Sequence, residues 1–142
     1  MLAPDVLQPL KEHLRSQGVV LAYLFGSMAR GEDGPISDVD IAVLFSKEPS
    51  REEAWDAMLR LPEEVSRVLG RQADVVVLEL APVTLRFAVI DEGSVLLSDD
   101  EDRRVDFESK AIREYLDTQH LRDVQRYYLY EWIRGGSRAA AS

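Results

Sequence analysis

Three aspartates are the residues of this chain best suited to do chemistry. Asp38 and Asp40 are separated by one residue, and Asp74 opens a later apolar run. In a strand, side chains two residues apart point to the same face and lie roughly 6.5–7 Å apart along the chain. Carboxylates placed in this way can converge on Mg²⁺, which prefers oxygen ligands and keeps waters and substrate phosphates in its shell. The three aspartates therefore form a candidate magnesium site of the two-metal kind.

A glycine–serine pair, Gly26 and Ser27, ends the apolar run that precedes these aspartates. Glycine permits close backbone approach, and Ser27 is a good N-cap for a short helical turn whose unpaired N–H groups would face a phosphate. Arg30 lies in that turn and suits either a bidentate phosphate contact or a solvated loop position. Neither a Walker A sequence nor a G-x-G-x-x-G fingerprint is present. The pattern predicts a phosphate-binding turn, and with the aspartates it indicates a site for a nucleoside triphosphate with magnesium.

The elements that must position these groups can be predicted from periodicity. Short apolar runs bounded by turn residues predict strands over 19–25, 41–45, 74–78 and 94–97. Apolar residues that recur every three or four positions predict helices over 5–16, 50–69 and 82–91, and from residue 100 onward. Because helices and strands alternate, we expect an α/β fold with a mixed sheet of about four strands flanked by helices.

The C-terminal part is predicted to be helical in two pieces that break near residues 117–118. The glycines at 135–136 are expected to end the second piece. With 142 residues, the chain is long enough for one domain with its own core. We therefore expect a single domain over residues 1–134 and a flexible tail over 135–142. Pro62, inside the second helical segment, is expected to kink or restart that helix.

Composition narrows the choice of partners and compartment. The formal net charge is −9, which argues against unaided binding of nucleic acid and is compatible with a cationic small molecule or a basic protein partner. The chain has no cysteine, so disulfides and thiolate zinc sites are excluded. The N-terminus lacks the pattern of a signal peptide, and no apolar run is long enough to span a membrane. We expect a cytoplasmic protein that contacts no membrane.

Three segments together resemble a known family. They are GSMARG at 26–31, SDVDIAVLF at 37–45 and ADVVVL at 73–78. Taken in this order and spacing, they resemble the minimal nucleotidyltransferases (MNT) of the polymerase-β-like superfamily. The resemblance covers roughly residues 10–110 and is less distinct beyond. It implies a polymerase-β-like nucleotidyltransferase core that uses ATP as substrate.

The resemblance also implies roles for individual residues. Asp38 and Asp40 correspond to magnesium ligands, and Asp74 corresponds to the third carboxylate, a metal ligand and base. Gly26 and Ser27 correspond to contacts with the triphosphate. Stand-alone proteins of this kind are commonly antitoxins that adenylylate a HEPN-type toxin on tyrosine, so the resemblance implies such a partner and a homo- or hetero-oligomer.

Three functions stay open on the sequence. The leading hypothesis is transfer of AMP from ATP to a tyrosine of a HEPN-type toxin, because the chain is nearly all catalytic core and lacks an added lobe for a small substrate. The second is a small-molecule adenylyltransferase of the aminoglycoside type. The third is a non-catalytic inhibitor that acts by contact. Tyr128 and Trp132 lie on an apolar stripe of the last helix and suit either core packing or a partner surface.

Overall fold

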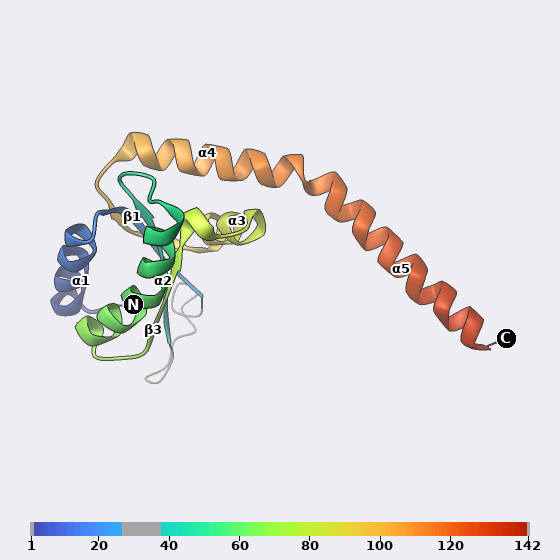
Figure 1. Ribbon diagram of the computed structural model, residues 1–142, viewed down its shortest axis with the longest axis horizontal. Coiled ribbons are helices and arrows are strands. Elements are labelled where there is room, and N and C mark those ends of the chain that lie inside the picture. Colours follow the sequence, from blue (N-terminus) through green and yellow to red (C-terminus); the bar gives the residue numbers. More distant parts are fainter. Residues whose placement is uncertain (1, 27–37, 142) are drawn as a thin grey trace.

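The computed structural model describes residues 2–26 and 38–141, with side chains described as far as Gly135. Helices and strands alternate in this part of the chain, as the periodicity predicts (Figure 1). The elements are α1 (Pro4–Ser16), β1 (Val19–Phe25), β2 (Val39–Phe45), α2 (Arg51–Leu69), β3 (Ala73–Val77), the 3₁₀ turn η1 (Leu78–Leu80), α3 (Val83–Glu92), β4 (Ser94–Ser98), α4 (Glu101–Asp117) and α5 (Gln119–Ala141). Their order confirms the predicted α/β fold.

The described strands form one mixed sheet in the order β3-β2-β1-β4. β1 is antiparallel to both β2 and β4, whereas β2 and β3 run parallel. The connection between the parallel strands is α2, as a parallel pair requires a long crossover. The expected mixed sheet of four strands is therefore confirmed.

Helices cover both faces of the sheet. On one face, β2 side chains such as Ile41 and Val43 pack with residues of α1 and α2, including Leu10 and Leu61. On the other face, alternate side chains of β1 and β2 pack with α3 and with Phe107 of α4. Burial on both faces explains why β1 and β2 read as nearly continuous apolar runs rather than as alternating ones.

Helix α2 shows how local sequence sets the bounds of an element. Ser50 is its N-cap, and Ser50 and Glu53 exchange backbone and side-chain hydrogen bonds in a capping box. Gly70 ends the helix with φ 69°, a value that favours glycine. Pro62 lies inside α2 without dividing it, so the expected restart is not observed. The buried residues of α2 recur on one face before and after the proline, and their packing holds the helix as one element.

The C-terminal helices differ from the prediction in their end. The break falls at Thr118, as predicted, but α5 continues to Ala141. Gly135 lies inside α5 without a positive φ, so it does not act as a C-cap. Isolated glycines cost a helix only about 1 kcal/mol each, and the alanines that follow favour continuation. The flexible tail over 135–142 stays a prediction.

Two groups of contacts that attach α4 and α5 to the body involve tyrosine side chains. The buried Tyr23 of β1 donates a hydrogen bond to the carboxylate of Glu108 on α4, at 2.5 Å, and Arg104 donates to the same oxygen at 3.1 Å. At the start of α5, the guanidinium of Arg122 lies over the ring of Tyr115, with 3.8 Å to the centroid. Tyr115 in turn stacks on Phe87 of α3. Beyond this junction α5 extends away from the body (Figure 1).

The structure shows whether Tyr128 and Trp132 of α5 pack in the core. Their side chains are 67% and 73% exposed. The core-packing interpretation of these residues is therefore wrong for the single chain.

None of the described helices is both long enough and apolar enough to cross a membrane.

Gly93 provides a test of the packing between α3 and the sheet. A Cβ at this position would lie 2.4 Å from the carbonyl oxygen of Val89 and 3.1 Å from that of Leu24. Both are backbone atoms, so Gly93→Ala should destabilise the fold by about 1–3 kcal/mol, the usual cost of overpacking. Chemical denaturation measures this loss. Gly135→Ala is the matched control, because nothing lies within 4 Å of its added Cβ; an equal loss in both variants would contradict the packing argument.

Tyr23 provides a test of the bond to α4. Burial and the hydrogen bond to Glu108 raise the pKa of the Tyr23 hydroxyl far above its usual value. Tyr23→Phe should cost about 1.5–3 kcal/mol near neutral pH, as for a hydrogen bond to a charged group. The unfolded chain ionises this tyrosine above about pH 10 while the folded protein does not, so wild type should lose stability there and the difference from Tyr23→Phe should shrink. Denaturation at both pH values, with the exposed Tyr130→Phe as control, checks this; a difference that grows with pH would contradict it.

Candidate active site

The end of β1 and the beginning of β2 meet at the predicted glycine and aspartate. Phe25, the last residue of β1, pairs with Asp40 of β2, and Gly26 follows with φ 75°. A Cβ on Gly26 would lie 2.2 Å from Oδ2 of Asp40. The carboxylate of Asp40 thus packs directly on the backbone of Gly26. Glycine is required here for two independent reasons, the left-handed backbone and the space that the carboxylate occupies.

Asp40 and Asp74 lie opposite each other on the parallel strands β2 and β3. Residues paired in register on neighbouring strands point to the same face and have backbones about 4.8 Å apart. Asp38 precedes β2 by one residue and shares the alternation of Asp40. The sheet therefore brings the three predicted carboxylates to one edge, where β2 and β3 begin and β1 ends. Sequence periodicity predicted each strand, and the register supplies the pairing.

The face that carries these groups is the one covered by α3 and α4. Asp40 alternates with the inward residues Ile41 and Val43 and shares its side of β2 with Ala42 and Leu44, which pack towards α3 and Phe107. Asp40 is half-buried, whereas Asp38 and Asp74 are exposed. The candidate site is thus open to solvent at the edge of that face, where a large charged substrate has access.

The donor set fits a hard cation, although it is not assembled as a metal cluster. Within residues 2–26 and 38–141, no three His, Cys, Asp or Glu side chains are grouped closely enough to hold a metal ion. Ionised carboxylates are acceptors only, and oxygen ligands of this kind suit Mg²⁺. Because Asp38 and Asp74 are exposed, their side chains have room to change rotamer, whereas Asp40 is confined by Gly26. Asp40 is therefore the half-buried member of the set, and its carboxylate lies against the backbone of Gly26.

Two predicted phosphate contacts, Ser27 and Arg30, lie outside the described residues. Of the predicted nucleotide-binding residues, the structure places Gly26 alone. Gly26 lies beside Asp40, and its role as a triphosphate contact stays a prediction. The roles of Ser27 and Arg30 stay predictions.

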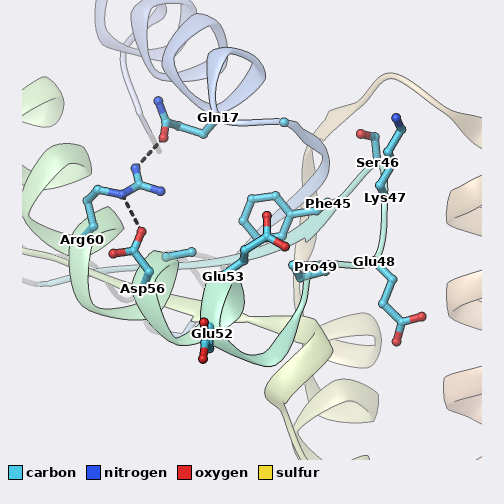
Figure 2. Close-up of a pocket in the computed structure, with 12 residues that line it drawn as sticks. Gln17, Phe45, Ser46, Lys47, Glu48, Pro49, Glu52, Glu53, Asp56 and Arg60 are labelled. Carbon is cyan, nitrogen blue, oxygen red and sulfur yellow. Dashed lines mark hydrogen bonds and ion pairs between the residues drawn. The ribbon is translucent and has the colours of Figure 1, made fainter.

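A pocket of about 610 Å³ lies at the other end of the sheet (Figure 2). It is formed where β2 ends, between Phe45 and the first turns of α2, and Arg60 crosses it to Asp56 and Gln17. Its lining carries four carboxylates but only two basic groups, those of Lys47 and Arg60. An acidic lining repels phosphate, so this pocket is a poor nucleotide site despite its size.

A buried carboxyl group near that end was missed by sequence reasoning. The side chain of Glu79, just after β3, is only 10% exposed and accepts a hydrogen bond from the N–H of Phe45 at 3.0 Å. Burial raises the pKa of Glu79, and the bond from Phe45 and the charge of Arg103 oppose that shift. Glu79 links the end of β2 to η1 and is remote from the aspartates. No spacing signal in the sequence separates it from the many exposed glutamates.

Comparison with known proteins identifies the family of this chain. Residues 8–102 match the polymerase beta nucleotidyltransferase family. The chain is 32% identical over 121 residues to the protein adenylyltransferase MntA of Shewanella oneidensis. The aligned region covers 85% of this chain and 81% of that protein. The matched region contains Gly26, Asp38, Asp40 and Asp74 within the family's bounds.

Solved structures extend the similarity to the C-terminal helices. One chain of the crystal structure of a toxin-antitoxin with AMP-PNP is 28% identical, with a TM-score of 0.68 and coverage of 93% of this chain and 99% of that chain. The structure of a tri-AMPylated Shewanella oneidensis HEPN toxin in complex with MNT antitoxin shares the fold, with 24% identity, a TM-score of 0.58 and coverage of 89% and 98%. The chain belongs to the polymerase beta nucleotidyltransferase family, and within it to the minimal nucleotidyltransferases that include MntA.

Proposed function

We propose that this chain is an antitoxin that transfers AMP from ATP to a tyrosine hydroxyl of a HEPN-type toxin partner. The observation that carries the proposal is the pairing of Asp40 with Asp74 beside the backbone of Gly26. This arrangement belongs to a chain whose relative MntA is a protein adenylyltransferase. A toxin-antitoxin with AMP-PNP is among the solved structures that it resembles, so a nucleotide at this fold and a toxin partner are both consistent with the proposal.

The transfer can be written for the residues in place. The tyrosine oxygen attacks the α-phosphorus of ATP, the bond from that phosphorus to the oxygen bridging to the β-phosphate breaks, and pyrophosphate leaves. The carboxylate of Asp74 takes the proton of the tyrosine hydroxyl, whose unperturbed pKa is near 10. Mg²⁺, when bound, neutralises charge on the triphosphate and favours departure of pyrophosphate. Asp38 and Asp40 would hold the ion, with Asp74 as the third ligand.

Asp40 has a special part in this scheme because it contacts both of its neighbours at the site. Its carboxylate lies against the backbone of Gly26, and Asp74 lies next to it in register. Pre-positioned groups contribute most of the acceleration in phosphoryl and nucleotidyl transfer, since little rearrangement is needed as charge develops. A triphosphate that contacts Gly26 would lie within reach of this carboxylate.

The two other functions make different predictions. A small-molecule adenylyltransferase of the aminoglycoside type would label a small cationic acceptor and leave the mass of the toxin unchanged. A contact inhibitor would bind the toxin without altering its mass. Intact-mass measurement of the toxin, incubated with this chain, ATP and Mg²⁺, separates the three. We expect the mass to rise by one adenylyl unit per modification; an unchanged mass with a silenced toxin would favour contact inhibition, and labelling of an aminoglycoside alone would favour the small-molecule enzyme.

Removal of either paired charge tests the catalytic assignment. Asp40→Asn and Asp74→Asn should each lower the transfer rate at least about 100-fold, because the charge that holds the ion or takes the proton is lost. Each should leave the fold intact and slightly stabilise the metal-free protein, since like charges directly opposite on neighbouring strands are destabilising. Transfer is followed by toxin mass and stability by denaturation in chelator. Asp91→Asn, an exposed aspartate on α3, is the control. A marked loss of stability in the Asp40 or Asp74 variant would mean that the aspartates are structural.

Gly26→Ala tests the contact that fixes Asp40. The added Cβ must displace the Asp40 carboxylate. The alanine must also adopt a left-handed backbone conformation, which costs an L residue roughly 1–2 kcal/mol. We expect transfer to fall sharply and stability to fall by more than the backbone cost alone. In an Asp40→Ala background, which lacks the clashing oxygen, the same change should cost only the backbone term. Equal costs in the two backgrounds, measured as a double-mutant cycle, would show that the contact does not exist in solution.

A further inference from the structure

Helix α5 exposes an unusual number of large apolar side chains. Seven of them are more than half exposed: Leu121, Tyr127, Tyr128, Leu129, Tyr130, Trp132 and Ile133. Successive helical residues are separated by roughly 100°, so Tyr128 and Tyr130 lie on nearly opposite sides of α5. A helix that is apolar on all sides is normally buried on all sides. In the single chain, α5 therefore lacks the environment that its sequence requires.

The direction of α5 is fixed at its start. Arg122 donates to the carbonyl oxygen of Tyr115 at 2.9 Å while its guanidinium covers the ring of Tyr115. That ring stacks on Phe87, with 3.8 Å between centroids and 6° between planes. The stack joins α5 to α4 and α3, the two helices that cover the sheet face of Asp40 and Asp74. Helix α5 is therefore attached to the body at its first turn and extends away from it (Figure 1).

The comparisons separate this projection from the catalytic fold. The match to the nucleotidyltransferase family ends at residue 102, so almost all of α4 and the whole of α5 lie outside it. The match to MntA spans 121 residues and must therefore include part of the region after residue 102. The match to the chain of the toxin-antitoxin with AMP-PNP covers 93% of this chain and extends further still. The helical extension is shared with proteins solved beside a toxin and is not part of the common catalytic core.

Charge distinguishes between the possible occupants. Over residues 119–135, α5 carries three arginines, Arg122, Arg126 and Arg134, and two acidic residues, whereas the whole chain has a net charge of −9. The helix is therefore slightly basic on an acidic body. A second copy of this chain would bring another acidic body close to the first, with a repulsion that a different partner avoids. A partner surface of apolar side chains bordered by carboxylates would complement α5.

We propose that α5 is the docking surface for the HEPN-type toxin, with Tyr128 and Trp132 as its main anchors. This inference rests on the proposed function for the identity of the partner. The toxin surface would be a groove between helices that encloses α5 on more than one side, with acidic groups near Arg126 and Arg134. Tyrosine and tryptophan are enriched among the residues that carry most of the binding energy in interfaces. Docking on α5 tethers the acceptor on the sheet face of the aspartates and converts an encounter into an oriented reaction.

Binding is tested with the cognate HEPN-type toxin, purified separately, in the background of Asp40→Asn so that transfer does not intervene. The double variant Tyr128→Ala with Trp132→Ala should weaken binding by calorimetry at least about tenfold, as expected for the loss of interface anchors. Leu59→Ala is the matched control, because Leu59 is 77% exposed on α2, away from α5. Equal binding by the double variant and the control overturns the proposal, and so does wild type that fails to bind the toxin.

Fluorescence reports directly on the anchor. The chain has two tryptophans, Trp55 on α2 and Trp132 on α5. With Trp55→Phe, the emission of Trp132 should shift to shorter wavelength and become protected from a soluble quencher when toxin is added, after subtraction of the toxin's own spectrum. With Trp132→Phe, the emission of Trp55 should not change. Protection of Trp55 instead of Trp132 would place the interface on the body and overturn the proposal.

Two further measurements distinguish this proposal from the proposed function and from self-association. With Asp40 intact, the double variant should bind ATP as wild type does and should modify toxin more slowly at low toxin concentration, with recovery as toxin is raised. If wild type binds toxin through α5 but leaves its mass unchanged, docking stands and AMP transfer fails. If wild type alone sediments as a dimer that the double variant dissociates, while toxin binding is unchanged, the occupant is a second copy and the proposal is overturned.

Discussion

The register of β2 against its two neighbours decides where every candidate catalytic group lies. β2 pairs Asp40 with Phe25 at the end of β1 on one side and with Asp74 on the other. Because side chains alternate along a strand, a slip of one residue would move Asp38 and Asp40 to the opposite face, under α1 and α2. The same slip would place Ile41 and Val43, which are fully buried, on the wrong side of the sheet. The hydrophobic pattern that holds the core therefore also holds the site.

This coupling has a cost that the core offsets. Two carboxylates face each other across neighbouring strands, which is unfavourable for a sheet in the absence of a cation. The residues that follow Asp40 and Asp74 are buried β-branched and aliphatic side chains, and each contributes on the order of 1.5–3 kcal/mol by leaving water. The repulsion is confined to the solvent-accessible edge of the sheet, where water screens it. A substrate that brings magnesium would convert this repulsion into binding.

Strand identities were predictable because each strand is an apolar run bounded by turn residues, and the observed bounds of β1 and β4 agree within one residue. The aspartates could be singled out together because their spacing and flanks suit metal ligands, and that role stays a prediction. The sequence did not predict that Asp40 pairs directly with Asp74 or that it contacts Gly26. Register across separate strands depends on packing rather than on local sequence. The bond from Tyr23 to Glu108 joins residues 85 positions apart and leaves no local signal.

The apolar stripe of α5 shows a different limit of sequence reasoning. Leu121, Tyr128 and Trp132 recur at helical spacing, and the same spacing serves a helix buried in its own core or one buried in a partner. Only the fold shows that both faces of the sheet are already covered before α5 begins. Within the described residues nothing buries these side chains, and on our proposal a partner does so. The contacts among Phe87, Tyr115 and Arg122 set the position of the start of α5, where that partner would bind. Partner choice and chemistry thereby reside in separate parts of one short chain, so that α5 can adapt to its partner without disturbing the register that positions the aspartates.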